Sequence, residues 1–204
     1  MTAPLIAVID HGAGNLVSIA RGLQRAGAEV RVVTSPSDLD GTDGIVLPGV
    51  GATATVMRGI RFAGFESALQ SWSLPLLGIC VGMQVLFERS DEDGAECLGL
   101  RAGTTKRLQN APTLPHIGWN EIEAFPDPLF QNLDDRPEVY FVHSYAPVPT
   151  SDDVVIARSA HGAPFVAAAR SGRVAGTQFH PERSGEVGLS ILANFVTSTV
   201  GART

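Results

Sequence analysis

Short apolar runs alternate with helical patterns through the first half of the chain, and this alternation constrains the fold more than any other feature. The apolar runs, which we expect to be strands, occupy residues 4–9, 29–33, 44–47 and 74–79. The helical patterns occupy residues 15–26, 53–72 and 81–89, with Gly59 and Gly64 as weak points in the second. Strand–helix units repeated in this way are typical of a parallel sheet joined by right-handed crossovers.

The pattern changes after about residue 91, where prolines separate shorter segments. Four of these segments are typical of strands joined by turns, with no helix between them: residues 139–142, 154–157, 165–169 and 174–179. We expect them to be antiparallel additions to the sheet, followed by a last helix at residues 185–199. The sequence therefore predicts a single domain, residues 1–204, with a three-layer α/β fold and a mostly parallel central sheet.

Composition and charge narrow the classes of function. Hydrophobic residues make up 44% of the chain and charged residues 18%, which excludes a disordered protein. The formal net charge is −6 and Lys and Arg do not cluster, which argues against nucleic acid as the main partner. No apolar stretch reaches the roughly 18 residues of a membrane span, and the first residues lack a signal-peptide pattern. We therefore expect a cytoplasmic protein without a membrane partner, whose thiols stay reduced rather than forming a Cys80–Cys97 bridge.

Cys80 is the candidate nucleophile, because the pattern Gly78-Ile-Cys80-Val-Gly82 lies between an apolar strand and a helix. A strand, a sharp turn and a helix in this order form a nucleophile elbow, in which the glycines leave room for the turn. The helix N-terminus favours a thiolate, and the N–H of Val81 would point at an oxyanion on the bound carbonyl. The alternative is a buried structural cysteine between packing glycines, and packing or surface is the role we expect for Cys97.

A general base for this thiol is available in the segment Gln178-Phe-His180-Pro-Glu182. His180 follows an apolar strand, and Pro181 ends that strand because it cannot donate to a ladder. Residues two apart in extended chain point to the same side, so Glu182 can hold one ring nitrogen while the other faces sulfur. The alternative is a capping histidine beside a solvated glutamate.

Two glycine-rich turns and the histidines complete the list of candidates. The turn at Gly49-Val50-Gly51 follows a strand and could supply a second oxyanion donor. The turn at residues 12–14 lacks the dinucleotide fingerprint and the lysine of a phosphate loop, so we discount it. The histidines lie far apart in the sequence, and we expect most of them in loops and turns without a metal site: His11, His116, His143, His161 and His180.

Three motifs, in this order, resemble those of the class I glutamine amidotransferases. They are Pro-Gly-Val-Gly at residues 48–51, Gly-Ile-Cys-Val-Gly-Met-Gln at residues 78–84 and Phe-His-Pro-Glu at residues 179–182. Further segments resemble the glutaminase subunits of imidazole glycerol phosphate synthases, which belong to histidine biosynthesis: residues 10–15, 115–120, 140–145 and 180–184. The resemblance spans the chain and implies a flavodoxin-like α/β fold.

The resemblance also implies a mechanism and a partner, and no cofactor. Cys80 would attack the side-chain amide of L-glutamine, His180 would carry the proton to ammonia, and Glu182 would orient His180. The residues implied in glutamine binding and the oxyanion hole are Gly49, Val50, Gly51, Val81, Gln84, His143, Ser144 and Tyr145. The ammonia would pass to a (β/α)8-barrel cyclase subunit, in a heterodimer whose interface would include Asn15, Trp119, Asn120, Tyr140 and Arg183.

The chain departs from this family at two positions, and other interpretations stay open. His11 stands where Tyr is common and Arg183 where Lys is common, and Arg keeps the charge but changes the hydrogen-bond geometry. The nearest rival is a glutaminase subunit of the pyridoxal phosphate or anthranilate type, against which Gly-Trp-Asn at residues 118–120 argues. A Cys-His hydrolase on a related sheet and a non-catalytic module on the same fold are the others. Gln84 argues against the hydrolase, and the intact set of Cys80, His180 and Glu182 argues against the module.

Overall fold

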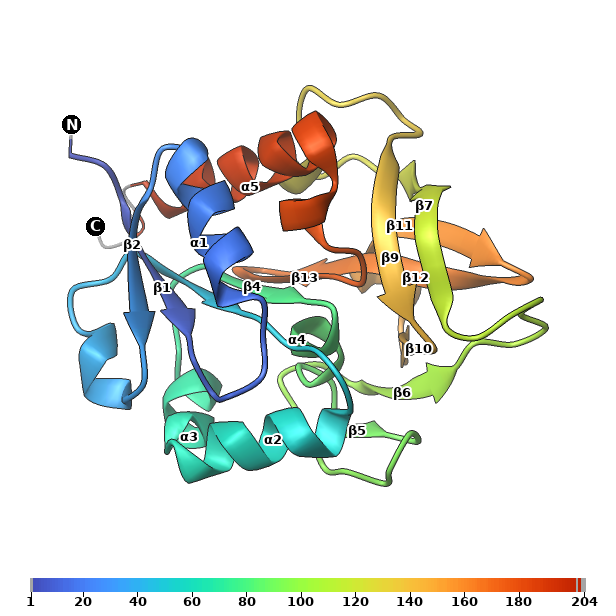
Figure 1. Ribbon diagram of the computed structural model, residues 1–204, viewed down its shortest axis with the longest axis horizontal. Coiled ribbons are helices and arrows are strands. Elements are labelled where there is room, and N and C mark those ends of the chain that lie inside the picture. The colour runs from blue at the N-terminus through green and yellow to red at the C-terminus, as the bar shows by residue number, and fades with distance from the viewer. Residues whose placement is uncertain (1, 201, 203–204) are drawn as a thin grey trace.

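An eight-stranded sheet crosses the computed structural model, which describes residues 2–200 and 202 (Figure 1). In spatial order its strands are β2 (Glu29–Val33), β1 (Leu5–Ile9), β3 (Gly44–Leu47), β4 (Leu76–Ile79), β13 (Val174–Thr177), β12 (Ala163–Ser171), β11 (Val155–His161) and β8 (Glu123–Ala124). The pairs from β2 to β13 are parallel, and those from β13 to β8 are antiparallel. The predicted α/β fold, with a mostly parallel sheet and antiparallel additions, is confirmed.

Helices cover both faces of this sheet and make the other two layers (Figure 1). On one face lie α1 (Leu16–Arg25) and α5 (Gly185–Thr199), and on the other lie α2 (Thr53–Phe62), α3 (Phe65–Gln70) and α4 (Val81–Gln84). Single 3-10 turns occur at η1 (Pro36–Leu39), η2 (Pro128–Phe130), η3 (Asp152–Val154) and η4 (Pro181–Arg183). Among the described residues, no helix has both the length and the apolar character needed to cross a membrane.

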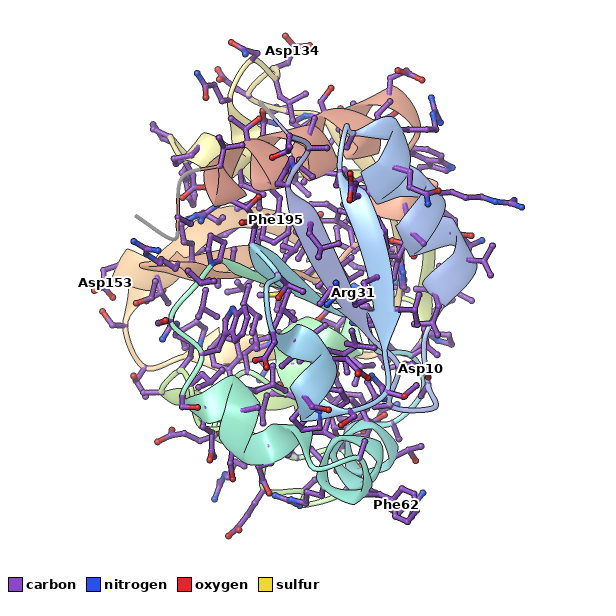
Figure 2. The ribbon with its side chains drawn as sticks, turned by 90° about the vertical axis from the view of Figure 1, so that its left-hand side faces the viewer. Asp10, Arg31, Phe62, Asp134, Asp153 and Phe195 are labelled. Atoms are coloured by element: carbon purple, nitrogen blue, oxygen red, sulfur yellow. The ribbon has the colours of Figure 1, made fainter. Side chains whose placement is uncertain are left out.

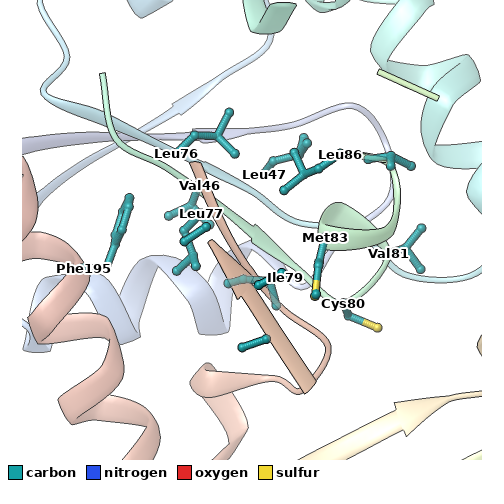
Figure 3. Close-up of a cluster of buried hydrophobic side chains, with 14 of the residues drawn as sticks. Val46, Leu47, Leu76, Leu77, Ile79, Cys80, Val81, Met83, Leu86 and Phe195 are labelled. Atoms are coloured by element: carbon teal, nitrogen blue, oxygen red, sulfur yellow. The ribbon is translucent and has the colours of Figure 1, made fainter. Parts of the chain in front are cut away.

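The core lies where β3 and β4 pass between the two helical layers, because every residue of both strands is buried. Figure 3 shows Phe195 of α5 on one side of these strands and Met83 and Leu86 on the other, with Cys80 at the end of β4. Figure 2 shows Phe195 between α5 and the sheet, whereas Phe62 points away from the molecule at its surface. A strand buried on both faces is an apolar run without alternation, as residues 76–79 are.

Two small sheets lie beside the antiparallel end of the main sheet. One contains β5 (Arg89–Ser90), β6 (Gly103–Arg107) and β10 (Tyr145–Pro149), and the other pairs β7 (His116–Glu121) with β9 (Glu138–His143). The run predicted at residues 139–142 is therefore not an addition to the main sheet. It is β9, whose hydrogen bonds go to β7.

Other details of the predictions were wrong or incomplete. The run at 174–179 contains β13, which is not antiparallel to both of its neighbours. The hairpin between β12 and β13 reverses the chain, so β13 runs parallel to β4. The helix expected at 81–89 ends at Gln84, since Glu88 N–H donates to Gly103 and the chain then pairs as β5. The helical region 53–72 divides at Gly64, a predicted weak point with a φ of +78°. The single-domain organisation remains a prediction.

Candidate active site

Cys80 sits on a sharp turn between β4 and α4, as the sequence predicts. Its φ of 55° and ψ of −113° are unusual for a residue with a side chain, and such strain costs about 1–3 kcal/mol. The flanking glycines make the turn fit, because a Cβ on Gly78 would lie 2.6 Å from the carbonyl oxygen of Gly82. A Cβ on Gly82 would overlap the carbonyl oxygen of Leu47. The elbow therefore needs both glycines, which favours the functional interpretation of Cys80 over simple packing.

His180 and Glu182 meet Cys80 because β13 lies next to β4 and runs parallel to it. Cys80 N–H donates to the last residue of β13, Thr177, at 2.8 Å. His180 follows this strand, and its Nδ1 lies 2.9 Å from Oε1 of Glu182, whose side chain is fully buried. The sequence predicted this arrangement. Within the described residues Nε2 of His180 has no hydrogen-bond partner, and His180 and Cys80 line the same cavity.

The charge state of His180 is set by its two neighbours. Burial lowers its pKa, but the interactions with the Cys80 thiol and with the Glu182 carboxylate outweigh this and raise the pKa well above its usual value. Nδ1 must carry a proton to donate to the carboxylate, which leaves Nε2 as the atom that exchanges a proton with sulfur. A protonated imidazole at this place stabilises a thiolate by charge attraction.

The sulfur of Cys80 has two further polar contacts. Nε2 of Gln178 donates to Sγ at 3.6 Å, and the thiol donates to the carbonyl oxygen of Val142 at 3.8 Å. Gln178 is itself held by Gln84, whose Nε2 donates to Oε1 of Gln178 at 3.0 Å and to the carbonyl oxygen of Tyr145 at 2.9 Å. The polar contacts of the thiol therefore include Gln178, just after β13, which Gln84 of α4 holds in place.

A cavity of about 130 Å³ opens at Cys80. Its lining consists of Val50, Gly51, Cys80, Val81, Gln84, Glu92, Val142, His143, Ser144, Tyr145 and His180. All but Glu92 and Val142 are predicted site residues, and of the predicted set around the nucleophile only Gly49 and Glu182 are outside this lining. Sequence reasoning missed Glu92 because it stands in an acidic loop without a motif, and it also missed Gln178 as a partner of sulfur. The order Gln178-Phe-His180 was the available signal, since residues two apart share a side.

The turn at residues 49–51, which the sequence predicts to supply an oxyanion donor, is closed. The N–H of Val81, a predicted oxyanion donor, donates instead to the carbonyl oxygen of Gly49 at 3.3 Å. In a trans peptide the carbonyl and the next N–H point in opposite directions, so the N–H of Val50 points away from the N–H of Val81. The preceding peptide is anchored by His11, whose Nε2 donates to the carbonyl oxygen of Pro48 at 2.7 Å.

Three of the five predicted interface residues, Trp119, Tyr140 and Arg183, contact one another. The guanidinium of Arg183 stacks on the ring of Tyr140, 4.2 Å from its centroid, and Trp119 meets the same ring edge-on at 6.1 Å. Trp119 is 55% exposed, and Asn15 directly precedes α1. The side chain of Asn120 is separate from them, because it follows Trp119 in β7 and donates to the carbonyl oxygen of Ala160 in β11.

Three of the histidines meet, although their separation in the sequence suggested isolated positions in loops and turns. His116 lies on β7 directly opposite His143 on β9, and the ring of His161 from β11 stacks on His116 at 4.1 Å. Burial lowers the pKa of His143 to about 3 and the pKa of His116 to about 4. Both rings are therefore neutral at physiological pH.

These two rings predict an acid-sensitive fold. Unfolded histidine binds a proton near pH 6.5, whereas the folded groups do so only near pH 4 and pH 3, so the free energy of unfolding falls as pH drops below 6.5. Each ring contributes up to about 1.4 kcal/mol per pH unit. His180 has a raised pKa, so its contribution to the free energy of unfolding is complete below pH 6.5 and is lost as pH rises above that value. A urea midpoint that stays unchanged between about pH 7 and pH 5 would contradict the buried neutral pair.

The sequence of the chain matches the class-I glutamine amidotransferase family over residues 7–199. Imidazole glycerol phosphate synthase subunit HisH of Synechococcus sp. (strain JA-3-3Ab) is 48% identical over 204 residues, covering 96% of this chain and 94% of that protein. The subunit HisH of Cutibacterium acnes is 47% identical over 198 residues, covering 94% and 95%. The subunit HisH of Chloroflexus aurantiacus is 44% identical over 201 residues, covering 94% and 95%.

Two solved structures have the same fold at low sequence identity. A Thermoplasma acidophilum protein, provisionally described as part of a GMP synthase, superposes with a TM-score of 0.79 at 23% identity, covering 100% of this chain and 97% of that one. The structure of PurLQS from Thermotoga maritima gives a TM-score of 0.72 at 20% identity, covering 99% and 100%. At these identities the likeness extends to the fold alone.

Proposed function

The chain belongs to the class-I glutamine amidotransferases, and within them to the HisH glutaminase subunits of imidazole glycerol phosphate synthase in histidine biosynthesis; we propose that Cys80, His180 and Glu182 are its catalytic triad. The observation that carries this assignment is local. A strained cysteine at the end of β4 and a histidine held by a buried carboxylate at the end of β13 face one small cavity.

The reaction follows from the positions of these groups. The thiolate of Cys80 attacks the side-chain amide carbon of glutamine, a C–S bond forms, and the carbonyl electrons move onto oxygen. As the C–N bond breaks, His180 gives its Nε2 proton to the leaving nitrogen and ammonia departs. Nε2 then takes a proton from water, whose oxygen attacks the glutamyl thioester. The C–S bond breaks, glutamate leaves, and Glu182 holds the ring through both steps.

The oxyanion of each tetrahedral intermediate needs hydrogen-bond donors. In the closed turn at residues 49–51 the N–H groups of Val50 and Val81 are not available to it. When the peptide between Gly49 and Val50 turns over, the carbonyl of Gly49 releases the N–H of Val81 and the N–H of Val50 swings inward. Both N–H groups then point to the oxyanion. One such donor contributes about 10²–10³ in rate, so turnover of this peptide acts as the switch of the enzyme.

Glutamine would be held by the cavity walls opposite the triad. Gln84, His143, Ser144 and Tyr145 contribute polar groups, and Glu92 contributes the carboxylate that suits an α-ammonium group. Glu92 also accepts from the N–H of Thr53, which fixes its position at the start of α2.

We expect Glu92→Gln to raise the KM for glutamine about tenfold with little change in kcat, because binding of the ground state and of the transition state is weakened equally. A change in kcat alone, measured in steady-state assays, would exclude this role.

The partner would be a (β/α)8-barrel cyclase subunit, which the chain would meet as a heterodimer in the cytoplasm. Trp119, Tyr140 and Arg183 form a partly exposed aromatic and cationic cluster of the kind that anchors interfaces, and Asn15, directly before α1, would join the same interface. Ammonia released at Cys80 would pass through that partner to a ribulosyl-type phosphate substrate. Contact between the partner and the turn at residues 49–51 would give the partner a means to open it.

The other interpretations of the sequence receive less support. A peptidase needs a site for a polypeptide, whereas this cavity of about 130 Å³ lies below the roughly 300–1,000 Å³ typical of larger ligands. A non-catalytic module would need neither the strained Cys80 nor a buried carboxylate on His180. The pyridoxal phosphate and anthranilate types are disfavoured by close relatives that match over nearly their whole length.

A glutamine analogue with an electrophilic diazoketone in place of the amide tests the proposed site. We expect it to modify Cys80 and leave Cys97 intact, as read by peptide mass spectrometry. Cys97 is the internal control, because burial, with Asp93 adding to it, raises the pKa of its thiol to about 11 and keeps it unreactive. Equal labelling of both thiols, or of neither, would contradict the assignment.

A further inference from the structure

A row of hydrogen bonds crosses the small sheet formed by β7 and β9 and ends at the wall of the cavity. Nδ1 of His143 lies 2.9 Å from the carbonyl oxygen of Tyr145. A carbonyl oxygen can only accept, so Nδ1 carries the proton. On the other side of the ring, Nε2 of His143 lies 3.1 Å from Nδ1 of His116.

The direction of the next bond follows from the charge of the rings. Both side chains are buried, with 5% of His143 and 4% of His116 exposed, and burial favours the neutral form of each. A neutral His143 with a proton on Nδ1 has an acceptor at Nε2. His116 must therefore donate from Nδ1, which leaves its own Nε2 as an acceptor.

Asn120 supplies the donor for that last acceptor. Its Nδ2 lies 3.4 Å from Nε2 of His116 and also donates to the carbonyl oxygen of Ala160 at 2.9 Å. Its Oδ1 accepts from the N–H of Glu121 at 3.0 Å, which fixes the orientation of the amide. The row thus runs in one direction, from Asn120 through His116 and His143 to Tyr145.

The end point of this row is shared with the nucleophile. The carbonyl oxygen of Tyr145 also accepts from Gln84, whose Nε2 reaches Gln178, and Gln178 donates to the sulfur of Cys80. Two donors, one from β9 and one from α4, hold this one carbonyl. The cavity wall at residues 143–145 is therefore fixed between β7 and α4.

We propose that His116, which does not line the cavity, is a positioning residue for glutamine binding: by donating from Nδ1 to His143 it locks the wall at residues 143–145 in place. This rests on the proposed function, because that wall is the proposed glutamine site. His116 acts through His143 and touches no reacting atom. Its loss should weaken binding and leave the chemistry at Cys80 largely unchanged.

The tautomers of the two rings test the proposal without reference to catalysis. Nitrogen NMR of histidine-labelled protein at neutral pH should show both His116 and His143 protonated at Nδ1 and bare at Nε2. Isolated neutral histidine prefers the opposite tautomer, so this pattern requires the row of bonds. A proton on Nε2 of either ring would overturn the proposal, whatever the protein does with glutamine.

Variants at residue 116 test the functional part. In His116→Asn, Nδ2 stands where Nδ1 of the histidine was and can still donate to His143, whereas His116→Phe keeps the ring stack with His161 but has no donor. We expect His116→Phe to raise the half-saturating concentration of the diazoketone analogue about tenfold, the loss of one buried hydrogen bond, with the limiting labelling rate nearly unchanged. His116→Asn should restore most of the affinity.

His161→Phe is the matched control, because it makes the same replacement in the same stack outside the row. It should leave the half-saturating concentration unchanged. Equal affinity in His116→Phe and the wild-type protein would overturn the positioning role, as would an equal loss in His161→Phe. If the wild-type protein is not labelled at all, the proposed function fails. The tautomer measurement still shows whether His116 donates from Nδ1 to His143.

Discussion

Replacing Cys80 with alanine is expected to abolish glutamine hydrolysis and to leave ammonia-dependent synthesis by the two-subunit complex intact. The variant lacks the thiol that lines the cavity but keeps its backbone, so the ammonia path and the partner surface persist. Loss of a triad nucleophile costs about 10⁴-fold or more in kcat. The assay follows glutamate release and imidazole glycerol phosphate formation in parallel, with glutamine or with an ammonium salt as the nitrogen source.

The matched control for this prediction is Cys97→Ala. Cys97 is buried and is not part of the cavity lining, so both activities should survive its replacement. If Cys80→Ala loses the ammonia-dependent reaction as well, the division of labour between the subunits is wrong. If it retains glutamine hydrolysis, Cys80 is not the nucleophile and is a structural cysteine.

Replacing His180 with asparagine has the second-largest expected effect. Asparagine ends at the position of Nδ1, so it can still donate to Glu182 but has no group to exchange a proton with sulfur. Without a cation beside the sulfur and without a base, we expect the labelling rate of Cys80 to fall at least about 10²-fold and glutamine turnover about 10³–10⁴-fold. Stopped-flow labelling separates this loss from any defect in binding.

The control is His161→Asn, a histidine outside the cavity that should retain the wild-type labelling rate. An unchanged rate in His180→Asn would show that the thiol is activated by another group. A rate that falls but recovers fully at high pH would restrict His180 to activation of the thiol. Turnover that stays low at high pH identifies the second task of His180, which is to protonate the leaving ammonia.

The parts of the fold that depend on local patterns could be predicted from the sequence. The apolar run at residues 76–79 has no alternation because it is buried on both faces, and the glycines beside Cys80 reveal the elbow. The order of His180 and Glu182 at a strand end was enough to predict their contact. In each case the relevant residues are neighbours along the chain, so periodicity and stereochemistry decide their arrangement.

The parts that depend on pairing between distant segments could not. β9 pairs with β7 rather than with the main sheet, and no periodicity in β9 distinguishes the two. The meeting of His116, His143 and His161 follows from that pairing and from the position of β11. The closed turn at residues 49–51 depends on the orientation of one peptide, between Gly49 and Val50, and the glycines at 49 and 51 permit either state. Glu92 reaches the cavity from a loop whose path only the folded chain defines.

The measurement that most directly tests the central claim is glutamine hydrolysis by the isolated chain, by the chain with the proposed barrel cyclase partner, and by that complex with the ribotide substrate bound. The N–H of Val81 is occupied by Gly49 at rest, so we predict almost no hydrolysis by the chain alone and at least about a hundredfold increase in the loaded complex. Rapid hydrolysis by the isolated chain, unchanged by the partner, would contradict a switch at residues 49–51.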